Sequence, residues 1–445
     1  MTSSVPPIGS TLSASADEML TAALERGGDS HETGRVIVTF REDAGDAGIQ
    51  SLTSSGVQVA DARDFADQAL AVEDAGDAEA LVFPEIGAAV MTGPAAEAHG
   101  MTAQTALAAD NPIESIEPEY FAFAEQGTVE AFGTRAPARE ADGVSEYLRG
   151  FVQAAEVIAR DLYNGRQQRM EAEEDEALVL GATWGLVACK VPPSVRTGAG
   201  VKVAVLDTGM DLQHPDFAGR TFVSGSFVGQ PVQDLHSHGT HCIGTACGPK
   251  APPGSTPRYG IAFGSSIFVG KVLSNTGSGT TGSVLAGMNW AIANRCEVIS
   301  MSLGSRSPEQ AAYTAAGRAA LSNGLLIVAA AGNDSGATGA PANSPTIMSV
   351  ASVDRTMAPS SFSNFGKVEI AGPGRDVVSS VPRPTRYGTK SGTSMATPHV
   401  AGCAALWAQT SHSLRGMSLW RKLQETAKPL PHPVSRVGAG LVRAP

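Results

Sequence analysis

The second part of the chain alternates short, continuous apolar runs with helix-like segments. The segments VLAGMNWAIANR (284–295) and PEQAAYTAAGRAALSNG (308–324) are rich in helix formers. Strands buried on both faces and separated by helices are typical of a mostly parallel sheet that helices cover on both sides. We therefore predict an α/β domain over residues 181–445. Its expected strands are VKVAVL (201–206), SIFVGKVL (266–273), EVISMSL (297–303) and GLLIVAAA (324–331).

The 445 residues exceed the roughly 250–300 residues that a single core usually serves, so a second folded unit is expected. Residues 35–125 have the pattern of a small α+β unit, and residues 1–34 are predicted to be flexible. Residues 126–180 are predicted to be a helical and acidic linker, because one apolar stripe runs along 140–170 and EAEEDE follows. The expected elements of the small unit are a strand at 35–40, an interrupted strand at 80–93, a helix within 94–109 and an extended segment at 113–124.

Composition excludes several classes of partner. The net charge of −12 disfavours nucleic acid and anionic membrane surfaces, which attract basic faces. No stretch of about 20 apolar residues predicts a membrane span, and the first 20 residues lack the basic and apolar regions of a signal peptide. An odd number of cysteines without a CxxC pair predicts buried free thiols, with room for one disulfide. The cysteines are Cys189, Cys242, Cys247, Cys296 and Cys403.

Four polar residues stand at the ends of the predicted strands or at the start of helices. Asp207 ends an apolar run and is followed by Thr-Gly, while Asn333 follows LLIVAAAG. His238 begins the helix-like HGTHCIGTA, and Ser394 stands where a Gly-Thr turn enters a long apolar helix. The carboxyl ends of parallel strands meet at one edge of the sheet, where active sites gather. These four side chains are therefore expected in one site, with Pro398 in the first turn of the last helix.

Together these side chains supply what acyl transfer requires. A serine hydroxyl is a poor nucleophile until a base removes its proton, and an imidazole accepts that proton and later returns it to the leaving amine. A buried carboxylate holds the imidazole in the required tautomer. The oxyanion then needs donors, for which the Ser394 amide and the Asn333 side chain are candidates. The pattern thus predicts Ser394 as nucleophile, His238 as base and Asp207 as its partner.

The motifs resemble the subtilisin family of serine peptidases. The resemblance rests on VLDTG, HGTHCIGT, SLG, AAAGN and GTSMATPHVAG, which occur in this order between residues 205 and 402. It implies a subtilisin-like three-layer α/β domain and a serine endopeptidase that needs no cofactor. It also implies that small residues line the pocket for an apolar side chain. The substrate-binding residues so implied are Ser302, Leu303, Gly304, Ala330, Ala331, Gly332 and Gly339.

The small unit also resembles an element of that family. Residues 35–124 are similar to its inhibitory propeptide, which implies a ferredoxin-like α+β domain that assists folding and plugs the cleft. The segment IESIEPEYFAFA (113–124) would then lie in the cleft, with self-cleavage near Ala124–Gln126 and a mature N-terminus between 125 and about 180. The partners implied are protein or peptide substrates and the chain's own propeptide. The protein is expected to be a monomer, and family habit implies export.

Each site residue also has a plainer interpretation. Asp207 and Ser394 are types that cap helices, and Asn333 is a common turn residue. His236, His238 and His241 form an HxHxxH pattern that can gather imidazoles around a metal, although His241 fits a packed residue one helical turn further on. A structural calcium is implied at Asp216, but the loop CGPKAPPGSTPRYG (247–260) departs from the usual pattern of its other ligands.

Two other functions use the same features. The fold could serve as a catalytically silent binding module, but every catalytic position holds a competent residue. The histidine pattern could belong to a metal-dependent hydrolase, which chelators alone would inhibit. A serine-directed reagent distinguishes both from a serine endopeptidase.

Overall fold

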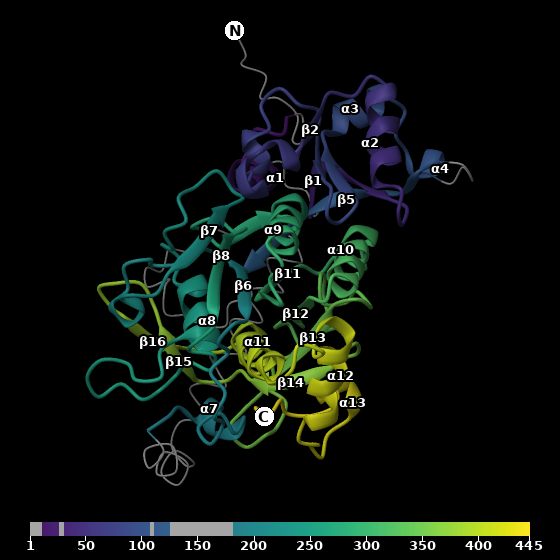
Figure 1. Cartoon of the computed structure of the whole chain (residues 1–445). Helices are drawn as coiled ribbons and strands as arrows, with labels where there is room; N and C mark the ends of the chain where they lie inside the picture. The colour runs from purple at the N-terminus through teal and green to yellow at the C-terminus, as the bar shows by residue number, and fades with distance from the viewer. Residues whose placement is uncertain (1–10, 26–30, 107–110, 125–180) are drawn as a thin grey trace, which may run out of the picture.

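A seven-stranded parallel sheet forms the centre of the larger domain. A computed structural model describes residues 11–25, 31–106, 111–124 and 181–445 (Figure 1). The strand order is β14-β13-β12-β10-β6-β8-β7, and every neighbouring pair is parallel. The four predicted apolar runs form β6, β8, β10 and β12. The strands are β6 (Lys202–Asp207), β7 (Phe222–Ser226), β8 (Ser266–Lys271), β10 (Val298–Met301), β12 (Leu326–Ala330), β13 (Met348–Val353) and β14 (Ile370–Pro373).

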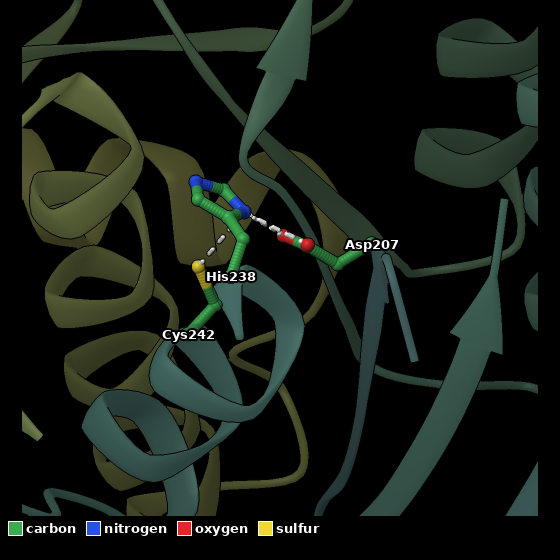
Figure 2. Close-up of side chains that lie close together, drawn as sticks. All are labelled: Asp207, His238 and Cys242. Atoms are coloured by element: carbon green, nitrogen blue, oxygen red, sulfur yellow. Dashed lines mark hydrogen bonds and ion pairs between the residues drawn. The ribbon is translucent and has the colours of Figure 1, made fainter. Parts of the chain in front are cut away.

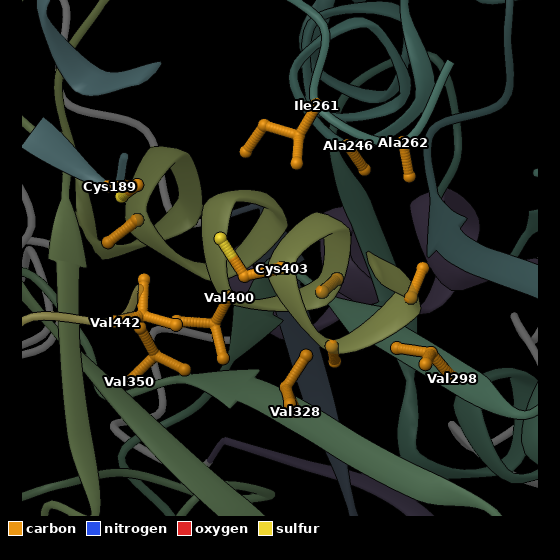
Figure 3. Packing of buried hydrophobic residues seen from close by; sticks show 14 of the residues in the cluster. Cys189, Ala246, Ile261, Ala262, Val298, Val328, Val350, Val400, Cys403 and Val442 are labelled. Atoms are coloured by element: carbon orange, nitrogen blue, oxygen red, sulfur yellow. The ribbon is translucent and has the colours of Figure 1, made fainter. Parts of the chain in front are cut away.

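Helices cover both faces of this sheet, which confirms the predicted three-layer α/β architecture. In β6, Val203 and Val205 pack with α8 (His238–Cys247) and α11 (Thr393–Thr410), whereas Leu206 packs with α9 (Thr281–Ala293) and α10 (Ala311–Ser322). Alternate residues of β6 are therefore buried in two different hydrophobic cores, one on each face of the sheet. This explains why its apolar run is unbroken. Figure 3 shows Val400 and Cys403 of α11 lying over Val328 and Val350.

Smaller elements complete this domain. The helices α7 (Trp184–Ala188), α12 (Gly416–Thr426) and α13 (Val434–Val437) pack on the same side of the sheet as α11. A short helix η4 (Pro215–Phe217) precedes β7, and β15 (Val377–Ser380) pairs antiparallel with β16 (Tyr387–Lys390). The five cysteines are free and buried, as predicted. Among the helices that the structure describes, none has the length and apolar character to cross a membrane.

The N-terminal unit is built on a second sheet, in the order β11-β5-β1-β4-β3-β2. Two of the strands that pair with β5 belong to the larger domain: β9 (Ser278–Thr280) and β11 (Leu303–Gly304). The unit's own strands are β1 (Glu32–Phe40), β2 (Val59–Asp61), β3 (Ala80–Phe83), β4 (Ala88–Met91) and β5 (Ile113–Ala124). Its helices are α1 (Ala16–Glu25), α2 (Gly45–Ser54), η1 (Ala62–Asp64), η2 (Ala66–Gln68), η3 (Val72–Asp74), α3 (Gly93–Ala98) and α4 (Ala103–Ala106).

Both faces of the unit's sheet are buried, by different partners. Val38 and Met91 face a small core that the unit forms with α2 and α3. Ile37 and Val90, one residue away on each strand, face the core that contains Trp290 of α9. Because the side chains alternate along each strand, the unit presents one face to itself and the other to the larger domain.

The N-terminal region differs from the sequence predictions in two places. Residues 1–34 are predicted to be flexible, yet α1 forms within them, with Ala16 and Met19 buried. The side chain of Arg35 explains this, since it donates to the carbonyls of Thr11, Leu12 and Ala14. The helix predicted within 94–109 is two helices, α3 and α4, because Gly100 adopts a φ of +63° between them. The predicted helix at 140–170 and the acidic linker lie outside the described residues.

Candidate active site

The first side chain of the site projects from the carboxyl end of β6. Asp207 is 1% exposed and accepts a hydrogen bond from the Thr208 amide at 2.7 Å. Gly209 follows with a φ of +99°, and a Cβ at this position would lie 2.0 Å from the Val232 carbonyl oxygen. The glycine of the Asp-Thr-Gly sequence is thus dictated by the turn that ends the strand, because only glycine fits this conformation and this space.

The second side chain begins α8. His238 is fully buried, and its Nδ1 donates to Asp207 Oδ1 at 2.8 Å and lies 3.0 Å from Oδ2 (Figure 2). Burial alone would raise the pKa of the Asp207 carboxyl, but the charge and hydrogen bond of His238 bring this pKa below its usual value. His238 Nε2, on the other side of the ring, has no hydrogen-bond partner among the described residues. The ring is therefore oriented with its basic nitrogen available.

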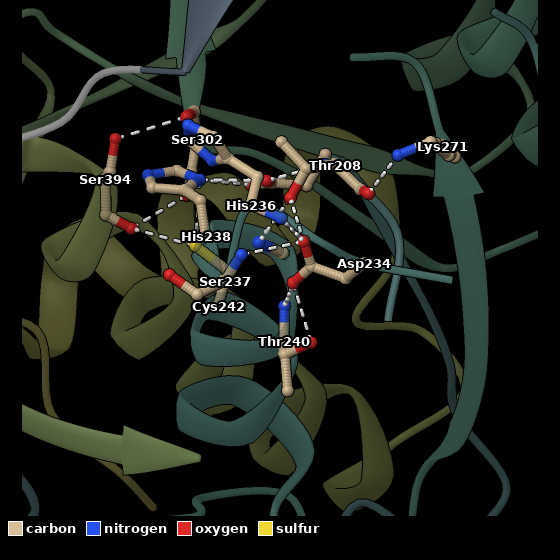
Figure 4. A network of polar contacts seen from close by, with 12 residues as sticks. Thr208, Asp234, His236, Ser237, His238, Thr240, Cys242, Lys271, Ser302 and Ser394 are labelled. Carbon is tan, nitrogen blue, oxygen red and sulfur yellow. Dashed lines mark hydrogen bonds and ion pairs between the residues drawn. The ribbon is translucent and has the colours of Figure 1, made fainter. Parts of the chain in front are cut away.

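The third side chain lies at the start of α11. Ser394 is buried, and its hydroxyl donates to the Ser302 carbonyl oxygen at 3.1 Å. Figure 4 shows Ser394 and Ser302 beside the His238 ring, and the Cys242 thiol contacts both His238 Nδ1 (3.9 Å) and the Ser394 carbonyl oxygen (3.6 Å). The hydroxyl rotamer in this structure points to Ser302. Catalytic hydrogen bonds are often absent until substrate is bound, so this rotamer does not contradict the expected pairing of Ser394 with His238.

Pro398 lies deeper in α11 than the sequence predicts. The helix begins at Thr393, so Pro398 is in its second turn and removes a hydrogen bond that would reach the Ser394 carbonyl. That carbonyl instead accepts hydrogen bonds from the Ser302 hydroxyl (2.8 Å) and the Cys242 thiol (3.6 Å). The expectation that Pro398 occupies the first turn is wrong. The proline frees the backbone oxygen that ties Ser394 to the neighbouring strand.

Asn333 follows β12 and reaches the same turn. Its Oδ1 accepts hydrogen bonds from the Thr393 amide (2.8 Å) and hydroxyl (3.0 Å). The Gly332 amide donates to the same hydroxyl at 3.2 Å, which joins the two loops. Because Oδ1 is an acceptor in these contacts, Nδ2 is the end of the side chain that can donate to a substrate oxygen.

The residues expected to bind substrate form two neighbouring segments. Leu303 and Gly304 pair with Ala124 and Phe123 of β5, so this strand edge does hold an extended peptide. The second segment contains Ala330, Ala331 and Gly332, and the Gly339 amide joins it by donating to the Ala331 carbonyl at 3.1 Å. A Cβ on Gly339 would lie 2.3 Å from the Ser305 carbonyl oxygen, so this position accepts only glycine.

The histidine pattern does not converge on one point. His241 Nε2 contacts the Val377 carbonyl at 3.0 Å, whereas His238 points to Asp207, and burial lowers the pKa of His241 well below its usual value. Among the described residues, the potential ligand atoms of Asp207, His238 and Cys242 do lie within 4.8 Å of one another. Burial raises the pKa of the Cys242 thiol well above its usual value, which opposes the thiolate that a metal prefers.

The residues around Asp216 do not fit a calcium ion. Asp216 is buried, and its two oxygens accept hydrogen bonds from the Tyr259 hydroxyl (2.6 Å) and the Tyr387 hydroxyl (2.8 Å). The Arg386 guanidinium lies 3.8 Å from the same carboxylate. Calcium requires six to eight oxygen ligands, and this carboxylate is instead surrounded by protein donors and a positive charge.

Two features of the site were not predicted. The edge strand β9 pairs with β5 on the side opposite β11, so the peptide lies between two strands. Asp234, four residues before His238, is fully buried and accepts several hydrogen bonds near the Asp207–His238 pair. A short Ser-Gly-Thr strand has no hydrophobic pattern, and an aspartate in a polar loop is ordinarily a turn residue, so neither gives a distinctive signal.

Comparisons with known proteins agree on one family. The model of the subtilase family, Peptidase S8, matches residues 198–440. Subtilisin Savinase of Lederbergia lenta is 39% identical over 269 residues, which cover 59% of this chain and 96% of that protein. Subtilisin E of Bacillus subtilis (strain 168) is 40% identical over 240 residues, covering 52% and 61% respectively.

A solved structure gives the same result for the fold. The crystal structure of a cold adapted subtilisin-like serine proteinase is 33% identical and superposes with a TM-score of 0.53. It covers 59% of this chain and 98% of its own. The chain therefore belongs to the subtilase family and is a serine-type endopeptidase with a subtilisin-like fold.

Proposed function

We propose that Ser394, His238 and Asp207 hydrolyse peptide bonds through an acyl-enzyme. His238 Nε2 removes the proton of the Ser394 hydroxyl as its oxygen attacks the substrate carbonyl, and then gives this proton to the leaving amine. Water then attacks the acyl-enzyme, with His238 again removing a proton and returning it to the Ser394 oxygen, and the carboxylic acid is released. Asp207 stabilises the imidazolium through the 2.8 Å hydrogen bond to Nδ1. The buried position of all three residues supports these roles, because charges in a dry site interact strongly.

The same proposal assigns the oxyanion to two donors. The Ser394 amide lies in the first turn of α11, where no helical carbonyl accepts its proton. Asn333 Nδ2 is the second donor, oriented by the hydrogen bonds of Thr393 to Oδ1. Each such donor contributes a factor of about 100 to 1,000 in kcat when it is aimed at the developing charge.

We propose further that residues 35–125 are an inhibitory propeptide. The observation that carries this proposal is the position of β5, whose end pairs antiparallel with β9 on one side and β11 on the other. A substrate that adds a strand between these edges would have the same backbone contacts. Ala124 is the last described residue of this strand and pairs with Leu303, next to Ser302. This pairing supports the proposal that the N-terminal unit blocks the strands to which a substrate would bind.

Two acid groups of β5 support an inhibitory interface. Glu119 of β5 is fully buried, and its Oε1 accepts from the Gly282 amide in the first turn of α9 at 2.9 Å. Glu117 accepts from the Ala311 amide, which begins α10, at 2.9 Å. Carboxylates at helix N-termini satisfy otherwise unpaired amides and complement the helix dipoles. The sequence Glu-Pro-Glu therefore anchors β5 on two helices of the catalytic domain.

Release of this unit requires cleavage after β5. We propose that the chain cuts itself near Ala124–Gln126, with the mature N-terminus between residue 125 and about 180. Residues 125–180 lie outside those that the structure describes. The mature enzyme would then act on protein or peptide substrates as a monomer.

Ser394→Ala tests both parts of the proposal. The purified variant should have no activity on casein and no reaction with a fluorophosphonate, and its intact mass should be that of the full-length chain. The wild-type chain should be active, labelled and shorter. Ser411→Ala, just beyond the other end of the same helix, is the matched control and should behave as wild type.

Three outcomes contradict the proposal. Residual casein activity in the Ser394→Ala variant would show that another residue is the nucleophile. Inhibition of the wild type by chelators but not by fluorophosphonate would indicate a metal-dependent hydrolase. Equal masses of wild type and variant, with activity only in the wild type, would leave the catalytic assignment standing and overturn self-processing.

A further inference from the structure

A buried carboxylate lies in the loop before α8. Oδ1 of Asp234 accepts hydrogen bonds from the Thr208 hydroxyl (3.0 Å), the His236 amide (2.9 Å) and the Ser237 amide (2.8 Å). Oδ2 accepts from the amide (2.9 Å) and the hydroxyl (2.7 Å) of Thr240. Figure 4 shows this carboxylate at the centre of the polar network behind the catalytic histidine. Each oxygen thus faces at least two donors.

The network connects the two segments that carry the hydrogen-bonded pair. Thr208 follows Asp207 directly at the end of β6, and Ser237 precedes His238 directly. The Thr208 hydroxyl, besides donating to Asp234, accepts from the Gly239 amide at 2.9 Å. The carboxylate therefore holds the neighbours of both catalytic residues, although it touches neither of their side chains.

The local backbone explains why α8 needs this support. Ser237 has a φ of +79° and its side chain makes no capping hydrogen bond to the helix. A non-glycine residue in this region is strained and persists only when its surroundings hold it. Asp234 satisfies the Ser237 and Thr240 amides from outside the helix, as an N-cap residue would. Without it, the turn that aims His238 would lose its hydrogen-bond partners.

A buried cation supports the network from the other side. Lys271 ends β8 and is fully buried, and its Nζ donates to the Thr208 carbonyl oxygen at 2.5 Å and to Asn275 Oδ1 at 2.9 Å. Burial lowers the pKa of Lys271 to about 8, against the charges of Asp234 and Asp207, which act to raise it. Thr208, in the turn after Asp207, is thus held both through its hydroxyl and through its backbone carbonyl.

We propose that Asp234 is a positioning residue, whose carboxylate sets the orientation of His238 relative to Asp207 and Ser394. The proposal rests on the roles assigned to these three residues above. An amide cannot replace this carboxylate, because its NH2 group would face backbone and hydroxyl donors. A displacement of about 1 Å in a catalytic group costs roughly a hundredfold in rate.

The test measures kcat and KM on a chromogenic peptide, per active site titrated. Asp234→Asn should lower kcat by about tenfold to a hundredfold and leave KM within about twofold. Thr208→Val should lower kcat in the same way, whereas Thr208→Ser, which keeps the hydroxyl, should restore most of it. Because both act through one contact, adding Thr208→Val to Asp234→Asn should lower kcat less than the two single losses multiplied.

Asp211→Asn is the matched control. Asp211 is as buried as Asp234, but its carboxylate binds the Arg383 guanidinium (2.8 Å) rather than the turn of α8. This variant should lower the thermal midpoint and leave kcat unchanged. The proposal is overturned if Asp234→Asn also lowers only the thermal midpoint. If Asp234→Asn does not fold, equal kcat values for Thr208→Val and Thr208→Ser overturn it instead.

The same assay separates the positioning role of Asp234 from the catalytic roles proposed for Ser394, His238 and Asp207. Activity in Ser394→Ala would refute the triad itself, whatever Asp234→Asn does. An inactive Ser394→Ala together with a wild-type kcat in Asp234→Asn would leave the triad standing and remove only the positioning role.

Discussion

The two folded units bury their sheets in different ways. In the catalytic domain, both faces of the sheet are covered by helices of the same domain, as the alternating contacts of Val205 and Leu206 show. In the N-terminal unit, one face packs on its own α2 and α3, and the other packs on α9 and α10. Ile37 and Val90 would be exposed to water if the two units separated. The N-terminal unit is thus stabilised by docking to a degree that the catalytic domain is not.

This difference matches the proposed roles. An inhibitor that must be removed gains from being stable mainly while bound, because it then unfolds and becomes a protease substrate after release. An enzyme that must outlast it needs a core of its own. Three substitutions can test whether the stability of the N-terminal unit depends on the interface. All use the inactive Ser394→Ala chain, so that the length does not change, and hydrogen exchange, which reports each region separately.

The largest effect is expected from Glu119→Ala. The substitution removes the acceptor of the Gly282 amide and of the Thr33 hydroxyl and leaves Arg35 without its nearby counter-charge. Loss of one partner in a buried polar cluster costs about 3 kcal/mol. Amides of β1, β4 and β5 should therefore exchange roughly a hundredfold faster, while those of β6 and β12 stay as they are.

The control for this prediction lies on the same strand. Glu114 is exposed, so Glu114→Ala should leave exchange in both units unchanged. If Glu119→Ala accelerates exchange in β6 and β12 as well, the two units unfold together and the proposed difference between them does not exist.

The same contrast shows how far sequence reasoning reached. The catalytic domain was predictable because strands buried on both faces give unbroken apolar runs, and because Asp207, His238 and Ser394 stand in specific motifs at their ends. β7 (Phe222–Ser226) was not predicted, since it is an edge strand with Gly and Ser and exposed side chains. The sheet of the N-terminal unit was predictable only in part, because one of its faces is covered by α9 and α10, which are distant in the sequence.

Side-chain contacts over long distances explain the remaining differences. The order of α1 depends on Arg35 reaching the carbonyls of residues 11–14, which no local pattern indicates. The hydroxyl of Ser394 bonds the Ser302 carbonyl, and Asp234 organises the turn before His238. Motifs specify which residues meet in the site, whereas the contacts that orient them depend on tertiary packing.

An intermediate effect is expected from pH through Glu73. This side chain packs beside Gly229 of the catalytic domain, and its Oε2 is buried without a hydrogen-bond partner among the described residues. Burial raises the pKa of Glu73 from 4.5 to about 7, although Arg35 opposes the shift and Asp74 and Glu119 add to it. The Glu73 carboxyl therefore binds a proton more tightly when the N-terminal unit is docked on the catalytic domain than when the unit is released.

The sign of the pH dependence follows from this difference. The contribution of Glu73 to docking is largest below about pH 4.5, falls as pH rises toward 7, and levels off above it. Over this range it changes the docking equilibrium by at most about tenfold per pH unit. Exchange in β1 and β4, corrected for its intrinsic pH dependence, should show this trend. Glu73→Gln should remove this part of the slope, and Asp74→Asn, at its exposed neighbour, should keep most of it, because Asp74 makes a smaller contribution to the shift than burial does. A slope that persists in Glu73→Gln would assign the effect to other groups.

The smallest effect is expected where α1 meets the edge of the cleft. Asp17 Oδ1 accepts hydrogen bonds from the hydroxyls of Ser274 (2.8 Å), Thr276 (2.6 Å) and Ser278 (2.5 Å), the last of which belongs to β9. Thr276 is exposed, so water can replace part of what Asp17→Ala removes, and a loss of about 1 kcal/mol is expected. Exchange in α1 should rise about fivefold.

The extent of this change is more informative than its size. Leu12 and Met19 stay buried and Arg35 keeps its three carbonyl contacts, so the sheet of the N-terminal unit should remain docked in Asp17→Ala. Glu18→Ala is the control, because the partner of its carboxylate among the described residues is Ser15 of its own turn and not the edge of the other domain. If Asp17→Ala accelerates exchange in β1 and β4 as strongly as in α1, the helix and the sheet are released as one body. Docking would then depend on this single carboxylate as well as on the apolar face of the sheet.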